Sequence, residues 1–405
     1  MSDASLFFHG VLLLPNRFVA DGAVGVRNGR IAAVGAAAQV LPGRLDGTPL
    51  VDAGDGYLSP GFVDLHVHGG HGADFMDGTE EAFATALSAH ARHGTTSIAP
   101  TTTAARHEQI LAMLDTCRRF KDRDTGGSRV LGAHLYGPYF HHEARGCHPD
   151  GPIRAPERRE YAQYLELAGA IVTASVAPEL PGAEQFTRDC LARGIRMGAG
   201  HTHATFAQVA DAVRWGIRHV DHLYCAMSDK SKLRQRQPYP MQGGVLEATL
   251  YFDELSTEVI ADGKHLTADL LLLALKIKGP DRLALVTDCN RALDMPEGPY
   301  LFGPLDGGEP FISHDGVGKM PDGMALASST RGMDHMVRTF ASLTGRPLWE
   351  IVRMASLTPA TIAGHERDIG SLEVGKRADV LVLSKDLEVE QVYLAGRKLG
   401  CRMGQ

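Results

Sequence analysis

The feature that most constrains the fold is a regular alternation, between residues 58 and 374, of short apolar runs with longer amphipathic stretches. Short apolar runs bounded by turn residues are typical of buried strands, and apolar residues at a spacing of three and four are typical of helices. Eight strands are expected, at Gly61–His66, Thr95–Pro100, Val130–Tyr136, Ala170–Val176, Ile195–His201, His219–Leu223, Val259–His265 and Leu283–Asp288. Helices are expected between most of them, among others at Glu80–His93, His107–Phe120, Glu184–Arg193, Thr205–Trp215 and Thr267–Ile277. Eight such units predict an α/β fold, a closed (β/α)8 barrel of the TIM type.

Both ends of the chain have a different pattern, in which short strands are separated by turns. Asn28-Gly29 between two apolar runs is a strong hairpin signal. The segments Ala378–Leu383 and Val389–Leu394 repeat this strand-like pattern near the other end. We therefore expect a small β-sandwich domain formed by residues 1–57 and 375–405, and a barrel over residues 58–374.

Charge and composition exclude several classes of partner. The net charge of -7 argues against a nucleic-acid-binding or anionic-membrane surface. No apolar run reaches the roughly 18 residues that a membrane span needs, and Met1–Pro15 lacks the cationic region and cleavage site of a signal peptide. The six cysteines show no C-x-x-C pairing, which suits reduced thiols: Cys117, Cys147, Cys190, Cys225, Cys289 and Cys401. We expect a cytoplasmic protein that acts on a small molecule.

Histidines recur where the expected strands end. His66 and His68 are two residues apart, so on a strand their side chains point the same way and two imidazoles can bind one cation. Taken alone, the pair is also typical of two hydrogen-bonded histidines at a strand end. His201, His222 and Asp288 end three other expected strands. Because a barrel collects the carboxyl ends of its strands at one face, the set predicts a site for zinc or a similar divalent ion.

At these residues the chain resembles the amidohydrolase superfamily, and within it the N-acetylglucosamine-6-phosphate deacetylases. The resemblance extends over almost the whole chain in order and spacing. Its segments are Pro60–His68, His134–Pro138, Gly200–Ala204, His222–Met227, Ala261–His265, Leu285–Asp288 and Gly375–Val380. It implies a metal-dependent hydrolase barrel with a terminal β-sandwich, which hydrolyses the acetamide of an N-acetylated amino sugar phosphate.

The resemblance also implies roles for individual residues. Asp288 corresponds to the general base that later acts as general acid, and His222 to a metal ligand or a donor to the carbonyl oxygen. Four residues correspond to positions that contact the substrate: His148, Cys225, Ala226 and His265. An arginine, Arg236 in preference to Arg234, corresponds to one that reaches the phosphate of the neighbouring subunit's substrate, which implies a homodimer.

Tyr136 departs from the family pattern, because the family has a glutamate there that bridges two metal ions. A phenol with an ordinary pKa near 10 is a poor anionic ligand unless the metal removes its proton. Two one-metal sites remain: one formed by His66, His68, His201 and Asp288, and one formed by His201 and His222 with Tyr136 or water. The first retains more good ligands, so we expect one Zn²⁺ per subunit bound there.

Two further residues and one loop are compatible with more than one substrate. Cys225 and Ser328 also differ from the family's usual residues, and the cationic loop Ser228–Gln242 suits either a phosphate clamp or an ordinary solvated loop. The leading hypothesis is deacetylation of an amino sugar phosphate. The alternative is hydrolysis of another acylated amine, a cyclic amide or an aminated heterocycle at a deaminase-type one-metal site. A catalytically silent binding protein is a third hypothesis, and the presence of Asp288 argues against it.

Overall fold

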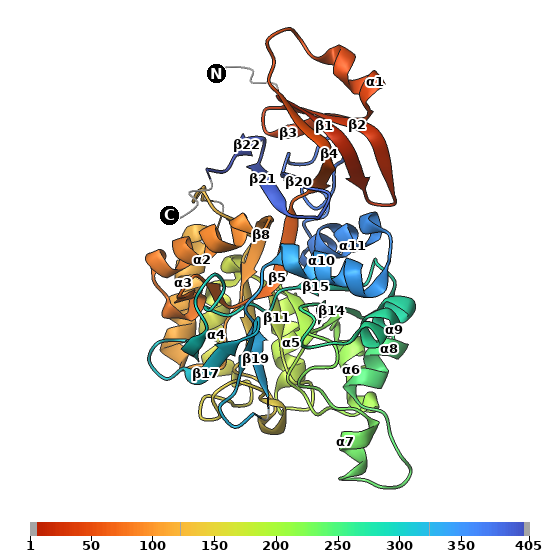
Figure 1. The fold of residues 1–405 in the computed structure, drawn as a ribbon. Helices are drawn as coiled ribbons and strands as arrows, with labels where there is room; N and C mark the ends of the chain where they lie inside the picture. Colours follow the sequence, from red (N-terminus) through yellow and green to blue (C-terminus); the bar gives the residue numbers. More distant parts are fainter. Residues whose placement is uncertain (1–5, 122, 324, 401–405) are drawn as a thin grey trace.

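The computed structural model describes residues 6–121, 123–323 and 325–400 of this chain. Figure 1 shows a sheet from the two ends of the chain above a larger α/β part. Cys401 and the rest of residues 401–405, which we assigned to the terminal domain, lie outside the described residues. No described helix is long and apolar enough to cross a membrane.

Over the described residues, the terminal sheet has seven strands in the order β22-β21-β20-β4-β1-β2-β3. Their bounds are β1 (Leu6–Leu14), β2 (Arg17–Arg27), β3 (Arg30–Ala36), β4 (Leu50–Pro60), β20 (Val380–Leu383), β21 (Val389–Leu394) and β22 (Arg397–Lys398). Asn28 and Gly29 have φ angles of 53° and 73°, the left-handed values that a tight hairpin turn requires. Phe8, Leu58 and Val380 are buried in one core. The expected β-rich unit from both ends is therefore confirmed.

The α/β part is built on parallel strands that follow one another in sequence order. They are β5 (Phe62–Val67), β8 (Thr95–Pro100), β9 (Arg129–Val130), β10 (Ala133–Tyr136), β11 (Ile171–Ser175), β12 (Arg196–Ala199), β13 (His219–Val220), β14 (Ser256–Ile260) and β15 (Leu283–Val286). One sheet contains β10 to β15 and another contains β5, β8 and β9. Isolated parallel bridges join Val67 to Cys289 and Thr101 to His134. The parallel α/β architecture is confirmed, with the link between the two sheets formed by single bridges instead of continuous ladders.

Helices lie between the strands, as the alternating pattern predicted (Figure 1). Five of them match expected helices within about two residues: α2 (Glu80–Arg92), α3 (His107–Phe120), α5 (Ala183–Leu191), α6 (Phe206–Trp215) and α9 (Ala268–Lys278). The start of α6 shows why, because Thr205 and Gln208 form a reciprocal capping box. The other helices are α1 (Ala37–Val40), α4 (Arg158–Glu166), α7 (Lys230–Arg234), α8 (Val245–Tyr251), α10 (Met333–Thr344), α11 (Leu348–Ala355) and α12 (Leu357–Ala363). Short 3₁₀ turns occupy Leu41–Gly43, Phe75–Asp77, His142–Ala144 and Ala168–Ala170.

The strand expected at Val259–His265 is wrong in its bounds, since β14 begins at Ser256 and ends at Ile260. Beyond it, the Asp262 carboxylate accepts hydrogen bonds from the backbone N–H groups of Lys264 and His265. These bonds stabilise a turn in place of a strand. The shift matters because it puts Glu258 in the middle of the strand.

A four-stranded antiparallel sheet after β15 was not predicted. Its strands are β16 (Gly298–Phe302), β17 (Glu309–His314), β18 (Val317–Lys319) and β19 (Leu326–Ser329), and a further two-stranded pair is β6 (Gly69–Gly70) with β7 (Ala73–Asp74). A parallel bridge joins Ser329 to Cys289, directly after β15. The inserted sheet therefore borders the carboxyl ends of the parallel strands.

Candidate metal centre and its cavity

A cavity of about 230 Å³ lies at the carboxyl ends of the parallel strands. Its lining combines imidazoles, a carboxylate, thiols and apolar groups. It consists of His68, Tyr136, Gly146, Cys147, His148, His201, His222, Cys225, Ala226, Ile260, His265, Asp288, Phe302, Ala325, Leu326 and Ser328. The last four belong to the inserted sheet or to the chain just before β19; of these, the sequence reasoning singled out Ser328 and missed the sheet that carries it. The face of the strands that a barrel uses for chemistry is thus the one that carries the cavity.

Three of the predicted ligands lie together at one side of this cavity. His66 and His68 come from the end of β5, and Asp288 follows β15, whose backbone is bridged to β5. The Nε2 atoms of His66 and His68 lie 3.7 and 3.2 Å from Asp288 Oδ1. One ligand atom from each of the three residues lies within 4.8 Å of the others, so the group can hold a metal ion. His201, which we expected as the fourth ligand of this ion, is not part of the group.

Glu258 fixes the orientation of the His66 ring through a hydrogen bond to Nδ1. Its Oε1 atom lies 2.5 Å from His66 Nδ1, and it also accepts a hydrogen bond from the backbone N–H of His222 at 3.2 Å. A carboxylate can only accept, so Nδ1 of His66 donates to Glu258, and its Nε2 atom has no hydrogen-bond partner among the described residues. Burial lowers the pKa of His66, but the charge of Glu258 outweighs this and raises it to about 9. The neighbouring carboxylates therefore favour positive charge at His66, whose Nε2 atom faces Asp288.

Asp288 is ionised and its backbone is strained. Burial raises the pKa of its carboxyl group, but the hydrogen bond from His68 and the charge of His66 together hold it well below its usual range. Its φ angle is 44°, and that of His201 is 46°, values that cost about 1–3 kcal/mol in a residue with a side chain. The Ser328 hydroxyl donates to Asp288 Oδ1 at 3.1 Å. Strain of this kind at strand ends is typical of a functional site.

Tyr136, His201 and His222 lie together at the other side of the cavity. His201 Nδ1 donates to the carbonyl of Ala144 at 2.7 Å, so its Nε2 lone pair is free. That atom lies 3.3 Å from His222 Nε2, which is itself 2.5 Å from the Tyr136 hydroxyl. Burial lowers the pKa of His222 to about 4. Burial and the charge of Asp288 raise the pKa of Tyr136 well above its usual value, so this side contains neutral groups only.

The residues predicted to contact substrate lie in the same cavity, apart from Arg236. His148, Cys225, Ala226 and His265 all line it. Asp262 Oδ2 lies 2.7 Å from His265 Nδ1. Burial lowers the pKa of His265, and the bond with Asp262 raises it above its ordinary value.

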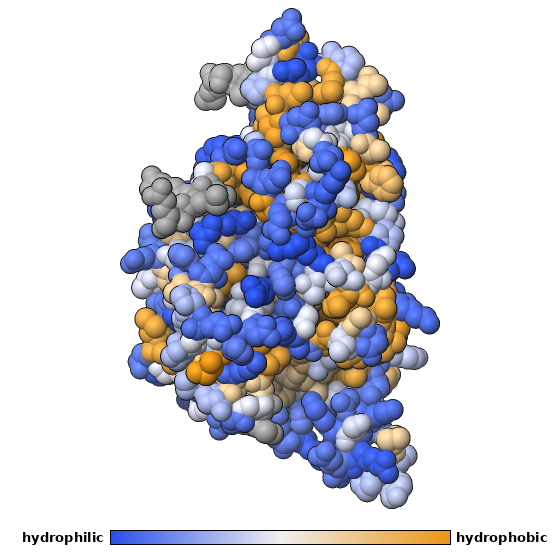
Figure 2. Space-filling view, in the orientation of Figure 1, coloured by the Kyte–Doolittle hydropathy of each residue, from blue (hydrophilic) through white to orange (hydrophobic). Residues whose placement is uncertain are grey.

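Arg236 follows α7 on a loop outside the cavity lining and forms an ion pair with Glu143. In Figure 1, α7 projects from the lower end of the molecule, and Figure 2 shows mostly hydrophilic residues over that end. The cationic loop is therefore exposed in this chain. Within one chain, Arg236 contributes no group to the cavity.

This fold, with its cluster of histidines and an aspartate, defines the class of protein. The model of the amidohydrolase family matches residues 57–399 of this sequence. The chain therefore belongs to the amidohydrolase family, and the expected membership is confirmed.

Within the family, the chain is similar to deacetylases of phosphorylated amino sugars. It is 34% identical over 341 residues to the N-acetylgalactosamine-6-phosphate deacetylase of Escherichia coli O157:H7, with 84% of this chain and 87% of the relative covered. It is 30% identical over 393 residues to the N-acetylglucosamine-6-phosphate deacetylase of Bacillus subtilis (strain 168), with 96% and 95% covered. A mutant N-acetyl-D-glucosamine-6-phosphate deacetylase of Mycobacterium smegmatis, solved in complex with N-acetyl-D-glucosamine-6-phosphate, superposes with a TM-score of 0.88. It shares 27% sequence identity, and the superposition covers 98% of this chain and 99% of that one.

Proposed function

We propose that this chain is a metal-dependent deacetylase that hydrolyses the acetamide of an N-acetylated hexosamine 6-phosphate. The observation that carries the proposal is the buried group of His66, His68 and Asp288 beside a cavity of about 230 Å³. The full-length similarity to the Mycobacterium smegmatis deacetylase, which is solved with N-acetyl-D-glucosamine-6-phosphate, supports the substrate class. As part of the same proposal, the parallel strands, with β9 and β10 counted as one, act as one (β/α)8 barrel over residues 58–374, and residues 1–57 and 375–405 form the terminal domain.

The residues present suit one divalent ion per subunit, and Zn²⁺ is the ion we propose. The free Nε2 of His66, the neighbouring His68 and the ionised Asp288 form a nitrogen and oxygen ligand set that zinc accepts. His201 and His222 border this group, with Tyr136 in place of a second carboxylate. When bound, such an ion lowers the pKa of a coordinated water and polarises the substrate carbonyl.

Asp288 is the proposed general base and general acid. Its carboxylate is ionised and lies at the cavity wall, where it can take a proton from the attacking water. The water oxygen bonds to the acetyl carbon, the C–N bond breaks, and Asp288 returns the proton to the leaving amine. The products are acetate and the free amino sugar phosphate.

The pair formed by Tyr136 and His222 is the proposed donor to the acyl oxygen. Both groups are neutral and 2.5 Å apart. With the Nε2 hydrogen of His222 donated to the phenol oxygen, the hydroxyl hydrogen of Tyr136 is left for the substrate. A donor positioned in advance stabilises the negative charge that develops on that oxygen during the reaction.

The remaining polar groups of the cavity are the proposed sugar contacts. We assign His148, Cys225 and Ala226 to the sugar ring and His265 to sugar or phosphate, because all of them line the cavity. Arg236, which lies outside it, would reach the phosphate bound by a second subunit of a homodimer. The free thiols of the described cysteines suit a cytoplasmic location.

The test is acetate release by the zinc-loaded protein from N-acetylglucosamine-6-phosphate and from its galactosamine isomer. We expect release from at least one, and loss of release after chelation with restoration by Zn²⁺. Inactivity toward both, with zinc bound, would falsify the phosphosugar assignment. Tyr136 favours one alternative, a one-metal deaminase-type hydrolase, and ammonia release from an aminated heterocycle would support that instead.

A further inference from the structure

A second cavity, of about 340 Å³, opens at the amino ends of the parallel strands, on the face opposite the candidate metal centre. Its wall includes residues at or before the starts of β12, β13, β14 and β15, such as Arg196, His219, Ser256 and Asp281. In a barrel, residues at this face usually contribute to stability and not to catalysis. The lining nevertheless includes His219, Asp221 and Glu258, each of which offers one ligand atom within 4.8 Å of the others.

Asp221 is a buried carboxylate without a hydrogen-bond partner in the described part of the chain. Its side chain is fully buried, and neither of its oxygens has a hydrogen-bond partner among the residues that the structure describes. The adjacent Ser175 hydroxyl is hydrogen-bonded to His134 Nε2, which is itself 4.0 Å from Asp221 Oδ1. An ionised group in such a place is costly unless a cation accompanies it.

Two glycines of the β12 region make the space that this carboxylate occupies. A Cβ atom on Gly200 would lie 2.1 Å from Asp221 Oδ2, and one on Gly198 would lie 3.3 Å from Asp221 Oδ1. Side chains at these two positions would fill the volume beside the carboxylate. The room around Asp221 is thus specified by the sequence.

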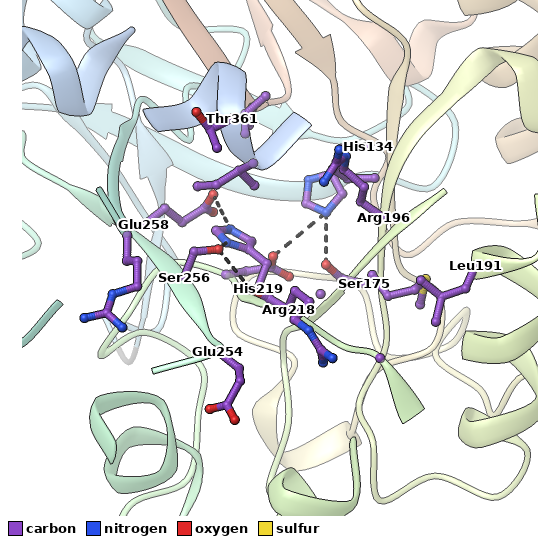
Figure 3. A pocket seen from close by; sticks show the side chains of 18 of the residues that line it. His134, Ser175, Leu191, Arg196, Arg218, His219, Glu254, Ser256, Glu258 and Thr361 are labelled. Carbon is purple, nitrogen blue, oxygen red and sulfur yellow. Dashed lines mark hydrogen bonds and ion pairs between the residues drawn. The ribbon is translucent and has the colours of Figure 1, made fainter. Parts of the chain in front are cut away.

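The hydrogen bonds of His219 leave a lone pair directed at a second carboxylate. Ser256 has one hydroxyl hydrogen, and it donates this to the carbonyl of Arg218 at 3.0 Å. It must therefore accept from His219 Nδ1, 2.9 Å away. In the neutral imidazole, Nε2 then has no hydrogen, yet it lies 3.1 Å from Glu258 Oε2. Two acceptors at this distance need a cation or an extra proton between them, and Figure 3 shows His219 lying between Ser256 and Glu258.

We propose that His219, Asp221 and Glu258 form a second site for a divalent transition-metal ion, reached through the cavity at the amino ends of the strands. One imidazole and two carboxylates form a ligand set that ions such as Zn²⁺ and Mn²⁺ accept. Glu258 belongs to both clusters, because its other oxygen holds Nδ1 of His66. The ion at the second site would therefore fix the carboxylate that orients a ligand of the first.

The test is a metal count by mass spectrometry on full-length protein that has been stripped of metal and dialysed against Zn²⁺. We call the group of His66, His68 and Asp288 the upper site and the group of His219, Asp221 and Glu258 the lower site.

We expect two equivalents of zinc in the wild type. One equivalent is expected in each of Asp221→Asn and His219→Gln, because these variants remove ligands of the lower site only. His68→Asn, which removes a ligand of the upper site, should also retain one equivalent. Glu254→Gln is the matched control, because Glu254 is an exposed carboxylate on the same cavity but outside the cluster, and it should retain two.

The combination of variants separates this inference from the proposed function. If the wild type binds one equivalent and His68→Asn removes it, the lower site is overturned and the upper one stands. If the wild type binds one equivalent and Asp221→Asn removes it, the upper site is overturned and the lower site stands. Circular dichroism of each metal-free variant checks folding, and an anomalous zinc peak between the three side chains in crystals of the wild type is the second, independent measurement. Absence of that peak at full zinc occupancy of the upper site would overturn the proposal.

Discussion

The two sides of the candidate metal centre each have two imidazoles but differ in their third group. His66 and His68 are accompanied by the ionised Asp288, and His201 and His222 by the neutral phenol of Tyr136. A divalent ion on the first side would be partly compensated by a carboxylate, and an ion on the second side would not. The comparison teaches that the third group, Asp288 on one side and Tyr136 on the other, determines how negative charge is distributed over the site.

The largest effect is expected from Asp288→Asn, which removes the charge of the first half and its proton acceptor. General acid–base groups contribute about 10²–10⁴-fold to rate, and we expect a loss in kcat/KM of that size for acetate release at saturating Zn²⁺. Asp77→Asn is the control, because Asp77 is an equally buried carboxylate that pairs with Arg291 outside the cavity. Equal losses in the two variants would show that the effect comes from stability and not from chemistry.

The next variants compare one histidine from each half directly. His68→Asn removes a group from the side that carries the carboxylate, so the upper zinc equivalent should be lost. His201→Asn removes one from the side that carries the phenol, so the zinc should stay bound while activity falls. Equilibrium dialysis with ⁶⁵Zn²⁺ measures both. Loss of the zinc in His201→Asn, with retention in His68→Asn, would show that the metal binds on the Tyr136 side and not beside Asp288.

Glu258→Gln should weaken zinc binding at the first half without removing a direct ligand. Groups that orient a metal-bound histidine are worth about 10–100-fold in metal affinity. We expect a loss in this range, measured by competition with a chelator of known affinity for the equivalent that restores activity. Ser328→Ala, which removes a hydroxyl hydrogen-bonded to Asp288 and not to a histidine, should have a smaller effect on the same affinity. An unchanged affinity in Glu258→Gln would mean that His66 needs no carboxylate to present Nε2.

Tyr136→Phe is expected to have the smallest effect on zinc binding, although it removes the proposed donor to the acyl oxygen and should therefore lower kcat for acetate release. It removes a buried hydrogen bond and leaves His222 Nε2 without that partner, which costs about 1–3 kcal/mol of folding free energy. The zinc content should not change, since the phenol is on the other side. Thermal unfolding and a metal count measure the two parts of the prediction.

The opposite change at this position sharpens the comparison. Tyr136→Glu places a carboxylate where the resemblance to the deacetylases implies one, so the second half should gain affinity for an ion and the metal count should rise by one equivalent over the wild type. If the count of Tyr136→Glu equals that of the wild type, the identity of residue 136 is not what separates the two halves.

Most of the candidate site could be predicted from the sequence, because its residues lie at the carboxyl ends of the expected strands. His66, His68, His201, His222 and Asp288 each follow or end an apolar run, and parallel strands bring their carboxyl ends to one face. Tyr136 stood out only against the family pattern. Its bond to His222 depends on side-chain directions across neighbouring strands, which spacing along the chain does not give.

What the sequence reasoning missed has physical causes as well. Glu258 was excluded because the apolar run Val259–Ala261 suggested a later strand start, whereas the chain turns at Asp262. The inserted sheet was missed because its strands are short and polar; β17 buries only alternate residues. One signal was present, since Asp315-Gly316 separates β17 from β18 and is a typical hairpin dipeptide.

The strand β4 has a consequence for anyone who divides this protein into parts. It runs from the terminal sheet to Pro60, pairs there with Val380 of β20, and is separated from β5 by Gly61 alone. A Cβ on Gly61 would lie 2.1 Å from Thr96 Oγ1, so this joint is tightly packed. A truncation before residue 375 would remove the partner of β4 and loosen the start of the strand that carries His66 and His68. The strands β4 and β20 and the candidate ligands His66 and His68 therefore belong to one packed unit, and neither part is a separate module for engineering.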